Sequence, residues 1–583
     1  MTLSRLVAGA LFVLAGVAVM VPLPASSAVA DSPVQRENAL PGTPGWSNGA
    51  FHDSALQGYA SATSVSPGET LQLHVSTPAR VDYRVEIVRI GWYGGTGGRL
   101  IACLPGCLEY RSGSSYAPAA PDPATGEVRL SWPVTDQLQI PADWASGYYV
   151  ALLVPSDGGA RGTVPFVVRE GSDRHSAILV EVPVNTWQAY NAWGGKSLYD
   201  FNSTSEARAN RVSFDRPYLW EGPGSQAVSV YELPIVRFLE REGYDVSYAT
   251  DVDVDRDPGL LLHHRVVIVA GHGEYWTGAM RDAFDAAVRA GTNIAFLGAN
   301  IGYWQVRFEN DRRTMVGYKS FDDPEPDPAG KTVLFRDLSP PRPECSLLGV
   351  QHYTGSYAWP RGDFLVAADD PWFAGTGLTA SSRVVAVVSR EHDQIPSGSP
   401  PNESCGLNLT VLFRHEGSDP LERAEAVRYT AASGARVFSA GSLELGWSLD
   451  DYRVNGDGVD TPVDPRMQRF VKNVLADLMQ PAAPSRVAAL RLRRSTRVTV
   501  TWADPRITGA LVFRHRGPAP FAPGDPAVAQ PCRSAVRACV DAARLRPGVY
   551  RYCAVLLDEW GRSGPRLSAV VRVRQPPRPH RKR

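Results

Sequence analysis

The stretch Val266-Val-Ile-Val-Ala-Gly-His-Gly-Glu-Tyr-Trp276 decides how this chain folds. It opens with five apolar residues, four of them β-branched, and so short an unbroken run is typical of a strand buried on both faces of a sheet. Gly271 ends the run, and polar residues follow at once. A strand buried on both faces needs helices above and below it. The stretch therefore predicts a parallel sheet covered by helices.

The flanking sequence repeats this pattern. Apolar runs at 177–182 and 293–297 predict two more buried strands. Between the runs, helical patterns over 233–242 and 277–289 are each followed by a glycine, which is a common stop for a helix. The other elements we expect are a strand at 436–440 and a helix at 467–478, with a long irregular stretch at about 315–416 that holds strand-like runs at 383–388 and 409–413.

The sequence on both sides of this α/β region shows a different pattern, with short strands of period two between turns. Such alternation predicts an antiparallel β-sandwich before the α/β region. Towards the C-terminus, Val498-Thr-Val-Thr-Trp502 and Gly548-Val-Tyr-Arg-Tyr552 resemble a fibronectin type III module. The expected domains are an N-terminal β-sandwich over 31–172, an α/β domain over 173–482, a fibronectin-III-like β-sandwich over 483–575 and a basic tail over 576–583. The fold class is thus multidomain α/β plus β, with a parallel α/β domain of the glutamine-amidotransferase-like, flavodoxin-like kind.

Residues 1–30 read as an export signal. An apolar run from Leu6 to Val21 is followed by Ala28-Val-Ala30, the small-x-small pattern that a signal peptidase needs. The run is shorter than the roughly 20 residues of a membrane span, and prolines follow it. We therefore expect a secreted, extracellular protein without a membrane span.

Charge and cysteines limit the remaining classes. The chain has 60 basic and 60 acidic residues, so no net charge favours a nucleic-acid partner. Seven cysteines in an exported protein suggest disulfides with one thiol left over. Cys103 and Cys107 could close a small loop, Cys345 and Cys405 lie in one irregular stretch, and the other three share the last domain. The segment Gly194-Gly-Lys-Ser197 lacks the first glycine of a phosphate loop, and no Gly-x-Ser-x-Gly elbow occurs.

A candidate site remains at the ends of the predicted strands. Ligands gather at the carboxyl ends of strands in a parallel sheet, and there the sequence places Tyr190, His272, Glu274 and Asn300. Carboxylate and phenol oxygens favour a hard cation, and a tyrosinate ligand points to ferric iron. His272, two residues from Glu274, could lie beside the metal. Asn300 could donate a hydrogen bond to a polarised carbonyl oxygen or orient a water.

These loops resemble the N,N-dimethylformamidase large (β) subunit family. The motifs that carry the resemblance are Asn185-Thr-Trp-Gln-Ala-Tyr-Asn191, Gly194-Gly-Lys-Ser-Leu-Tyr199, Val212-Ser-Phe-Asp-Arg-Pro217, Gly271-His-Gly-Glu-Tyr-Trp276, Gly298-Ala-Asn300, Arg89-Ile-Gly-Trp-Tyr-Gly-Gly95 and Ser146-Gly-Tyr-Tyr149. The resemblance implies mononuclear iron held by two tyrosines and one glutamate, with a His, an Asn and a second Glu nearby.

Carried over by position, the resemblance assigns the metal ligands as Glu274, Tyr190 and Tyr149, with Tyr148 as the fallback for the last. His272, Asn300 and, as the second glutamate, Glu444 become the catalytic residues. The implied function is a secreted iron-dependent hydrolase of a carbon–nitrogen amide bond in a small amide.

An alternative is a non-catalytic extracellular protein whose tryptophan-rich loops bind a glycan or another cell-surface polymer. The family's amidase works with a small partner subunit that is not evident in this chain. The export signal and the C-terminal module are further departures, so the substrate is not carried over. The sequence leaves the oligomeric state open, a homo-oligomer included.

Overall fold

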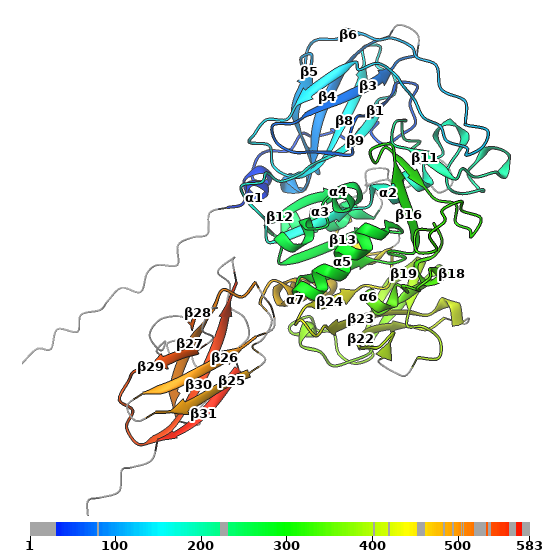
Figure 1. Ribbon diagram of the computed structural model, residues 1–583. Coiled ribbons are helices and arrows are strands. Elements are labelled where there is room, and N and C mark those ends of the chain that lie inside the picture. The colour runs from blue at the N-terminus through cyan, green and yellow to red at the C-terminus, as the bar shows by residue number, and fades with distance from the viewer. Residues whose placement is uncertain are drawn as a thin grey trace, which may run out of the picture.

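The computed structural model, shown in Figure 1, describes residues 31–573 except 79–80, 222–230, 400–402, 418–419, 452–460, 482–483, 485, 493–494, 503, 505, 518–531, 534–537 and 559–566. The predicted export signal and basic tail lie outside the described residues. Most of the regular structure is β-sheet, with few helices. No helix within the described ranges is long and apolar enough to cross a membrane.

The N-terminal part, blue to cyan in Figure 1, packs two β-sheets face to face after a short helix α1 (Pro33–Asn38). One sheet has the order β1-β3-β7 and the other the order β2-β9-β8-β4-β5, with β6 paired to β4. The strands are β1 (Gln57–Ala60), β2 (Ser64–Val65), β3 (Thr70–Ser76), β4 (Asp82–Ile90), β5 (Gly98–Leu104), β6 (Arg111–Ser112), β7 (Asp136–Gln139), β8 (Gly147–Pro155) and β9 (Gly162–Val168).

Strand β8 is buried on both faces, and its two faces serve different cores. Tyr149 and Leu153 point into the interior of the sandwich, whereas Tyr148 and Val150 pack against the central domain. Side chains alternate along a strand, so neighbouring tyrosines face opposite ways. The sandwich is therefore joined to the central domain through a continuous apolar core.

The central domain is built on one nine-stranded sheet of order β12-β10-β13-β15-β24-β23-β22-β18-β19. Pairing is parallel from β12 to β24 and antiparallel from β24 to β19. The strands are β10 (Ile178–Val182), β12 (Val246–Thr250), β13 (Val266–Gly271), β15 (Asn293–Gly298), β18 (Gln351–Val366), β19 (Arg383–Gln394), β22 (Thr410–His415), β23 (Ala424–Thr430) and β24 (Arg436–Ser439).

The antiparallel half of this sheet comes mainly from the stretch that the sequence pattern leaves irregular. Strands β18 and β19 are long and bulged, and their register shifts at several points. Because bulges break the period-two alternation, the pattern there reveals only short runs. Smaller strands complete the domain: β14 (Tyr275–Thr277), β16 (Trp304–Glu309), β17 (Thr314–Val316) and β11 (Arg211–Ser213) form a ribbon, and β20 (Glu403–Ser404) pairs with β21 (Leu407–Asn408).

Helices cover both faces of the parallel strands. Helices α3 (Glu232–Arg241) and α7 (Pro465–Leu478) contribute to one core cluster, and α5 (Gly278–Ala290) contributes to the other. Alternate residues of β13 belong to these two clusters. The continuous apolar run therefore did indicate a strand buried on both faces. The remaining helices are α2 (Val184–Tyr190), α4 (Asp251–Arg256) and α6 (Cys345–Leu348).

The C-terminal domain, orange to red in Figure 1, is a two-sheet β-sandwich with Trp502 in its core. Its sheets are β25-β26-β29 and β28-β27-β30-β31. The strands are β25 (Arg486–Arg491), β26 (Thr496–Thr501), β27 (Gly509–Arg516), β28 (Cys532–Arg533), β29 (Ala538–Asp541), β30 (Gly548–Leu557) and β31 (Leu567–Val573). The buried guanidinium of Arg265 joins this domain to the central sheet by ion pairs with Asp504 (2.9 Å) and Asp558 (2.7 Å).

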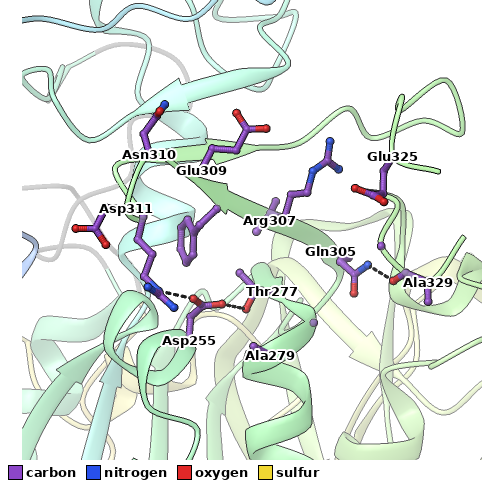
Figure 2. A pocket seen from close by; sticks show the side chains of 15 residues that line it. Asp255, Thr277, Ala279, Gln305, Arg307, Glu309, Asn310, Asp311, Glu325 and Ala329 are labelled. Atoms are coloured by element: carbon purple, nitrogen blue, oxygen red, sulfur yellow. Dashed lines mark hydrogen bonds and ion pairs between the residues drawn. The ribbon is translucent and has the colours of Figure 1, made fainter. Parts of the chain in front are cut away.

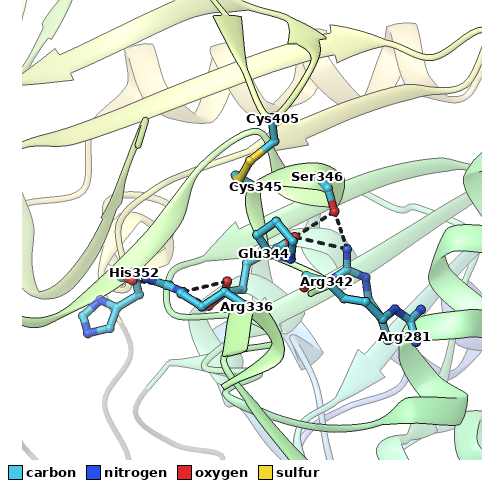
Figure 3. The surroundings of a disulfide bond; sticks show 9 residues. Arg281, Arg336, Arg342, Glu344, Cys345, Ser346, His352 and Cys405 are labelled. Carbon is cyan, nitrogen blue, oxygen red and sulfur yellow. Dashed lines mark hydrogen bonds and ion pairs between the residues drawn. A yellow bond between two sulfur atoms is a disulfide. The ribbon is translucent and has the colours of Figure 1, made fainter. Parts of the chain in front are cut away.

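Disulfides form as the cysteine spacing suggested. Cys103 bonds Cys107 in the sandwich, and Cys345 bonds Cys405 across 60 residues of the central domain. Cys553 is buried in the last domain. Figure 3 shows the second disulfide at the start of α6, next to the ion pair between Arg336 and Glu344 (2.6 Å). The disulfide thus fixes the irregular segment that leads into β18.

A buried ion pair ties the sandwich to the central domain and gives the first prediction. Arg89 of β4 pairs with Glu240 of α3 at 2.7 Å, and both side chains are fully buried. Replacing Arg89 by Met leaves a carboxylate buried without its cation. We expect Arg89→Met to lower the free energy of unfolding by about 3–5 kcal/mol, measured by urea denaturation.

The matched control is Arg129→Met. Arg129 is 43% exposed, and its partner Asp215 keeps a second cation in Arg313. We expect this control to cost less than about 1 kcal/mol. Equal losses in the two variants would contradict a structural role for the buried pair.

Candidate functional site

Two glycines shape the edge of the sheet at which the candidate site lies. Gly271 and Gly298 face each other at the carboxyl ends of β13 and β15. A β-carbon on Gly298 would lie 1.7 Å from the carbonyl oxygen of Gly271, which is far inside contact distance. Gly271 has a φ of +72°, a region that favours glycine. The strands therefore end close together, and the residues that follow, His272 to Glu274 and Asn300, start from neighbouring points.

Tyr190 and Tyr199 reach the same place from the segment after β10. Tyr190 is the last residue of the short helix α2, and the side-chain amide of Asn185 in that helix donates to the carbonyl oxygen of Tyr275 (3.1 Å). Tyr199 follows a turn in which its backbone N–H donates to the Ser197 hydroxyl (2.9 Å). Asn202 donates to the carbonyl oxygen of Tyr190 (3.0 Å). The two phenol rings lie 4.3 Å apart between centroids, with their planes tilted by 31°.

The oxygen atoms of these side chains converge. The Tyr199 hydroxyl oxygen lies 2.8 and 2.9 Å from the two carboxylate oxygens of Glu274 and 2.9 Å from the Tyr190 hydroxyl. It also accepts a hydrogen bond from the hydroxyl of Tyr275 (2.6 Å). Glu274 is only 2% exposed and Tyr190 7%. We call Tyr190, Tyr199, Glu274 and Tyr275 the oxygen cluster.

An acid–base group adjoins the oxygen cluster. Nε2 of His272 lies 2.7 Å from the carboxylate of Glu391 and 3.5 Å from that of Glu274. Nδ2 of Asn300 donates to Glu391 (3.1 Å), and the backbone N–H of Asn300 donates to Asp393 (2.8 Å). Asn300 has a φ of +52°, so its backbone is held in a strained region at the site.

Burial and neighbouring charges shift the pKa values of the titratable side chains in this site. Burial, and next the negative charge of Glu274, raise the pKa of both Tyr190 and Tyr199 well above the usual value. Burial disfavours the charged imidazole, but the Glu391 carboxylate outweighs it and raises the pKa of His272 to about 9. Burial opposes ionisation of Glu391 too, yet the charge of His272 lowers its pKa to about 2. His272 and Glu391 therefore form a charged pair.

Lys319 brings a second cation to the oxygen cluster. Its ammonium nitrogen lies 3.3 Å from the ring centroid of Tyr199 and 5.2 Å from that of Tyr275. A cation over a phenol face is attracted by the ring quadrupole. Desolvation lowers the pKa of Lys319 to about 7, against the pull of Glu274. Lys319 is therefore only partly protonated at neutral pH.

The donor set fits a small hard cation. Oxygen ligands at right angles in an octahedral site, each about 2.0–2.1 Å from the metal, lie roughly 3 Å apart. The Tyr199 oxygen lies at this spacing from the oxygens of Tyr190 (2.9 Å) and Glu274 (2.8 Å). A phenol has one proton to donate, yet the Tyr199 hydroxyl has four oxygen neighbours. Phenolate and carboxylate oxygens suit a hard ion such as ferric iron better than a thiolate-seeking one.

Tyr149, predicted as a metal ligand, does not join the oxygen cluster and is corrected to a core residue. Its hydroxyl donates to the carbonyl oxygen of Ala145 (2.7 Å), and its ring stacks on Trp144 at 5.2 Å. The reason is the alternation of β8, which turns this side chain into the sandwich. The fallback Tyr148 faces the central domain but packs against Trp187 and Tyr248. Tyr199 takes the place expected for the second tyrosine.

Glu444 lies near the acid–base group, since the backbone N–H of its neighbour Leu443 donates to the carbonyl oxygen of Glu391 (3.2 Å), and its carboxylate binds a cation. It pairs with Arg361 (2.9 Å), whose guanidinium lies over the ring of Trp447. The carboxylate that contacts His272 and Asn300 is Glu391, so the assignment of Glu444 as the second glutamate is corrected to Glu391. The other expected residues, Tyr190, His272, Glu274 and Asn300, are brought together.

Two of the missed residues left a sequence signal. Tyr199 lies within the same loop as Tyr190, in Gly194-Gly-Lys-Ser-Leu-Tyr199. Glu391 follows the apolar run 383–388 in Ser389-Arg-Glu-His-Asp393, a charged ending like that of β13. Lys319 left no such signal, because it follows the small strand β17 by three residues.

A surface groove of about 490 Å³ lies beside the N-terminus of α5, as Figure 2 shows. Its central carboxylate, Asp255, already accepts from the Thr277 hydroxyl (2.6 Å) and from Arg312 (2.6 Å). None of the residues that line it belongs to the oxygen cluster. The groove is therefore separate from the candidate site.

The sheet and the cluster at its edge define a multidomain α/β protein with a buried oxygen-donor site. The chain belongs to the N,N-dimethylformamidase beta subunit-like, C-terminal family, whose model matches residues 84–459. That match covers most of the N-terminal sandwich and most of the central domain.

Named relatives agree with this family. The N,N-dimethylformamidase beta subunit of an Alcaligenes species is 32% identical over 89 residues, which are 14% of this chain and 12% of that protein. The N,N-dimethylformamidase beta subunit of Paracoccus aminophilus is 30% identical over 139 residues, or 23% of this chain and 18% of that protein. The alignments thus span less than a fifth of either relative.

The similarity to solved structures is too low to define the fold. The spore cortex lytic enzyme SleM of Clostridium perfringens is 21% identical and covers 20% of this chain and 35% of its own, with a TM-score of 0.14.

The close approach of β13 and β15 gives the second prediction. A methyl group at residue 298 would collide with the backbone of Gly271, and backbone cannot move aside as a side chain can. We expect Gly298→Ala to lower the free energy of unfolding by about 1–3 kcal/mol or more in urea denaturation.

Gly278→Ala serves as the control. Gly278 opens α5, and the atom nearest to its added methyl group is the end of the Gln305 side chain at 3.3 Å. Alanine also has a helix propensity better than glycine by up to about 1 kcal/mol. A Gly298→Ala protein as stable as the Gly278→Ala protein would contradict the packing of the strand ends.

Proposed function

We propose that this protein is an exported, iron-dependent amidohydrolase that cleaves the carbon–nitrogen bond of a small amide. One observation carries the proposal. The Tyr199 hydroxyl oxygen lies within 2.9 Å of the Tyr190 hydroxyl and of both Glu274 carboxylate oxygens, beside an imidazole–carboxylate pair. Membership of a family that includes N,N-dimethylformamidase beta subunits supports amide chemistry. The export signal predicted for residues 1–30 supports a site of action outside the cell.

Tyr190, Tyr199 and Glu274 would hold the iron. Bound there, ferric iron supplies Lewis acidity towards an amide carbonyl and lowers the pKa of water. The three side chains would offset its charge, and both phenols would ionise only because the cation compensates for their burial. Tyr275 donates to the Tyr199 oxygen and so keeps that ring in place.

The acid–base group would move the protons. Glu391 is 24% exposed, whereas His272 and Glu274 are each 3% exposed, so Glu391 is the member that solvent reaches. Glu391 would take a proton from the attacking water and, with His272, return it to the leaving amine nitrogen. As the proton leaves, the water oxygen bonds to the carbonyl carbon, and the carbon–nitrogen bond then breaks.

Asn300 would orient the reacting groups and donate to the oxyanion. One of its two Nδ2 hydrogens is bonded to Glu391, which leaves the second for the substrate. Its Oδ1 is buried and has no hydrogen-bond partner within the described ranges. A buried acceptor without a partner is costly, so a water or an amide N–H at this atom would be stabilised.

The third prediction concerns the metal ligands. Purified protein should contain about one iron per chain and show the visible charge-transfer absorption of tyrosinate bound to ferric iron. Tyr199→Phe should remove the absorption and most of the iron, because one phenolate ligand is lost. Tyr149→Phe is the matched control and should keep both, at a cost of about 1 kcal/mol in stability for the lost hydrogen bond.

Metal analysis and a visible spectrum check the third prediction. A colourless, iron-free parent protein, or loss of colour in Tyr149→Phe with colour retained in Tyr199→Phe, would contradict the proposed ligand set. The first of these results would favour the alternative of a non-catalytic binding protein.

The fourth prediction concerns the proton carrier. Glu391→Gln should retain iron but lower kcat for hydrolysis of small formamides and acetamides by about 10²- to 10⁴-fold, since a neutral amide cannot accept the proton. Glu444→Gln is the comparison, and its folded fraction should keep turnover. Full activity in Glu391→Gln, with loss of activity in folded Glu444→Gln, would reverse the assignment of the second glutamate.

A further inference from the structure

A second group of ligand-type side chains lies away from the oxygen cluster, at the junction between the sandwich and the central sheet. Glu170 and His175 lie in the connection from β9 to β10, and His264 lies two residues before β13. One carboxylate oxygen of Glu170 is 3.4 Å from Nδ1 of His175 and also 3.4 Å from Nε2 of His264. One donor atom from each residue lies within 4.8 Å of the others.

The hydrogen bonds of His264 fix which of its ring atoms carries the proton. Nδ1 lies 2.9 Å from the carbonyl oxygen of Ser176, which can only accept, so Nδ1 is protonated and donates. In the neutral imidazole, which full burial favours, the other ring nitrogen is an acceptor. Nε2 must then present a lone pair.

That lone pair faces another one. Nε2 of His264 is buried and has no hydrogen-bond partner among the described residues, and the nearest charged atom is the Glu170 oxygen at 3.4 Å. Two electron-rich atoms thus face each other without a proton between them. A cation between them would turn this repulsion into two bonds.

Two of the three donor spacings match those of a tetrahedral metal ion. Zinc binds imidazole nitrogen at about 2.0–2.1 Å and carboxylate oxygen at about 2.0–2.2 Å, so neighbouring ligands of a tetrahedral site lie roughly 3.4 Å apart. Both distances from Glu170 have this value. The surrounding hydrogen bonds are also those of a metal site, because the Ser176 carbonyl orients His264 and the Ser176 N–H donates to the second Glu170 oxygen (2.8 Å).

We propose that Glu170, His175 and His264 bind a divalent ion of the zinc class. Two imidazoles and one carboxylate are a donor set that zinc accepts. His175 is 40% exposed, so the fourth position of the ion is open to solvent. Glu170 also lines a hollow of about 660 Å³.

The ion would join two parts of the chain and lie close to a third. Glu170 and His175 belong to the segment that leaves the sandwich, and His264 belongs to the edge of the central sheet. The carbonyl oxygen of His264 accepts from Arg506 of the C-terminal domain (2.9 Å), and the adjacent Arg265 binds two aspartates of that domain. Binding would therefore stabilise the junction at which the domains meet.

The fifth prediction tests this site with ZnCl2 alone on the full-length protein after treatment with a chelator. The background is Glu274→Gln, which weakens binding at the oxygen cluster and keeps the two sites apart. We expect one equivalent of zinc to bind in calorimetric titration. His175→Ala should weaken this binding by at least about 10- to 100-fold. That is the usual loss when only a hydrogen-bonding partner of a metal ligand is removed, and here a ligand itself is lost.

His263→Ala is the matched control. His263 is exposed and stacks on His175 at 4.5 Å between ring centroids, but it is not one of the three ligands. We expect His263→Ala to bind zinc as the background protein does. Because His175 is on the surface, its variant should fold, and thermal unfolding without zinc checks this.

A second measurement keeps the test independent of calorimetry. Zinc should raise the midpoint of thermal unfolding of the background protein and of His263→Ala, but not of His175→Ala, because an ion that binds only the folded state stabilises it. Absence of zinc binding in the background protein, or binding in His175→Ala equal to that of the background, would overturn the proposal. Loss of binding in His263→Ala with full binding in His175→Ala would do the same.

Discussion

The carboxylate of Glu274 lies at the end of a buried strand, surrounded by phenol rings and 2% exposed. An ionised carboxylate in such a place is stable only if nearby donors or cations replace the water it has lost. The Tyr199 hydroxyl and the imidazole of His272 approach it, and the side-chain nitrogen of Lys319 lies over the Tyr199 ring. These donors and this cation replace part of the water that the carboxylate has lost.

The backbone makes this convergence possible. Gly271 and Gly298 let two adjacent strands end in contact, and the chain then turns sharply on both sides. Tyr190 and Tyr199 arrive from the neighbouring strand β10 through helix α2 and a hydrogen-bonded turn. Glu391 arrives on β19, which ends the antiparallel half of the nine-stranded sheet. The acid–base group therefore depends on both halves of the sheet.

The sequence predicted the parallel half of the fold well and the antiparallel half poorly. Residues 266–270 and 293–297 are continuous apolar runs, and their identity as buried strands does not depend on distant partners. The bulged strands β18 and β19 show no clean alternation, so Glu391 had no predicted strand to place it and Glu444 was chosen instead. The site was predicted where residues follow a strand directly, as His272, Glu274 and Asn300 do.

Tyr149 shows a different limit. Ser146-Gly-Tyr-Tyr149 contains two adjacent tyrosines, and a one-residue difference decides whether a side chain faces the sandwich interior or the central domain. Neither tyrosine contacts the oxygen cluster, because Tyr149 packs inside the sandwich and Tyr148 packs in the core that the sandwich shares with the central domain. Tyr199, which does join the oxygen cluster, lies in a loop, and neither the period-two nor the helical pattern predicts where a loop side chain points. Spatial convergence of loops is the part that sequence patterns do not contain.

The most direct test of the account is the position of the metal. A crystal of the iron-containing protein, measured at the iron absorption edge, should give one anomalous peak per chain at the oxygen cluster. We expect that peak about 2 Å from the phenol oxygens of Tyr190 and Tyr199 and from the carboxylate of Glu274. A peak elsewhere in a protein that carries stoichiometric iron, or Tyr149 among its ligands, would contradict the account.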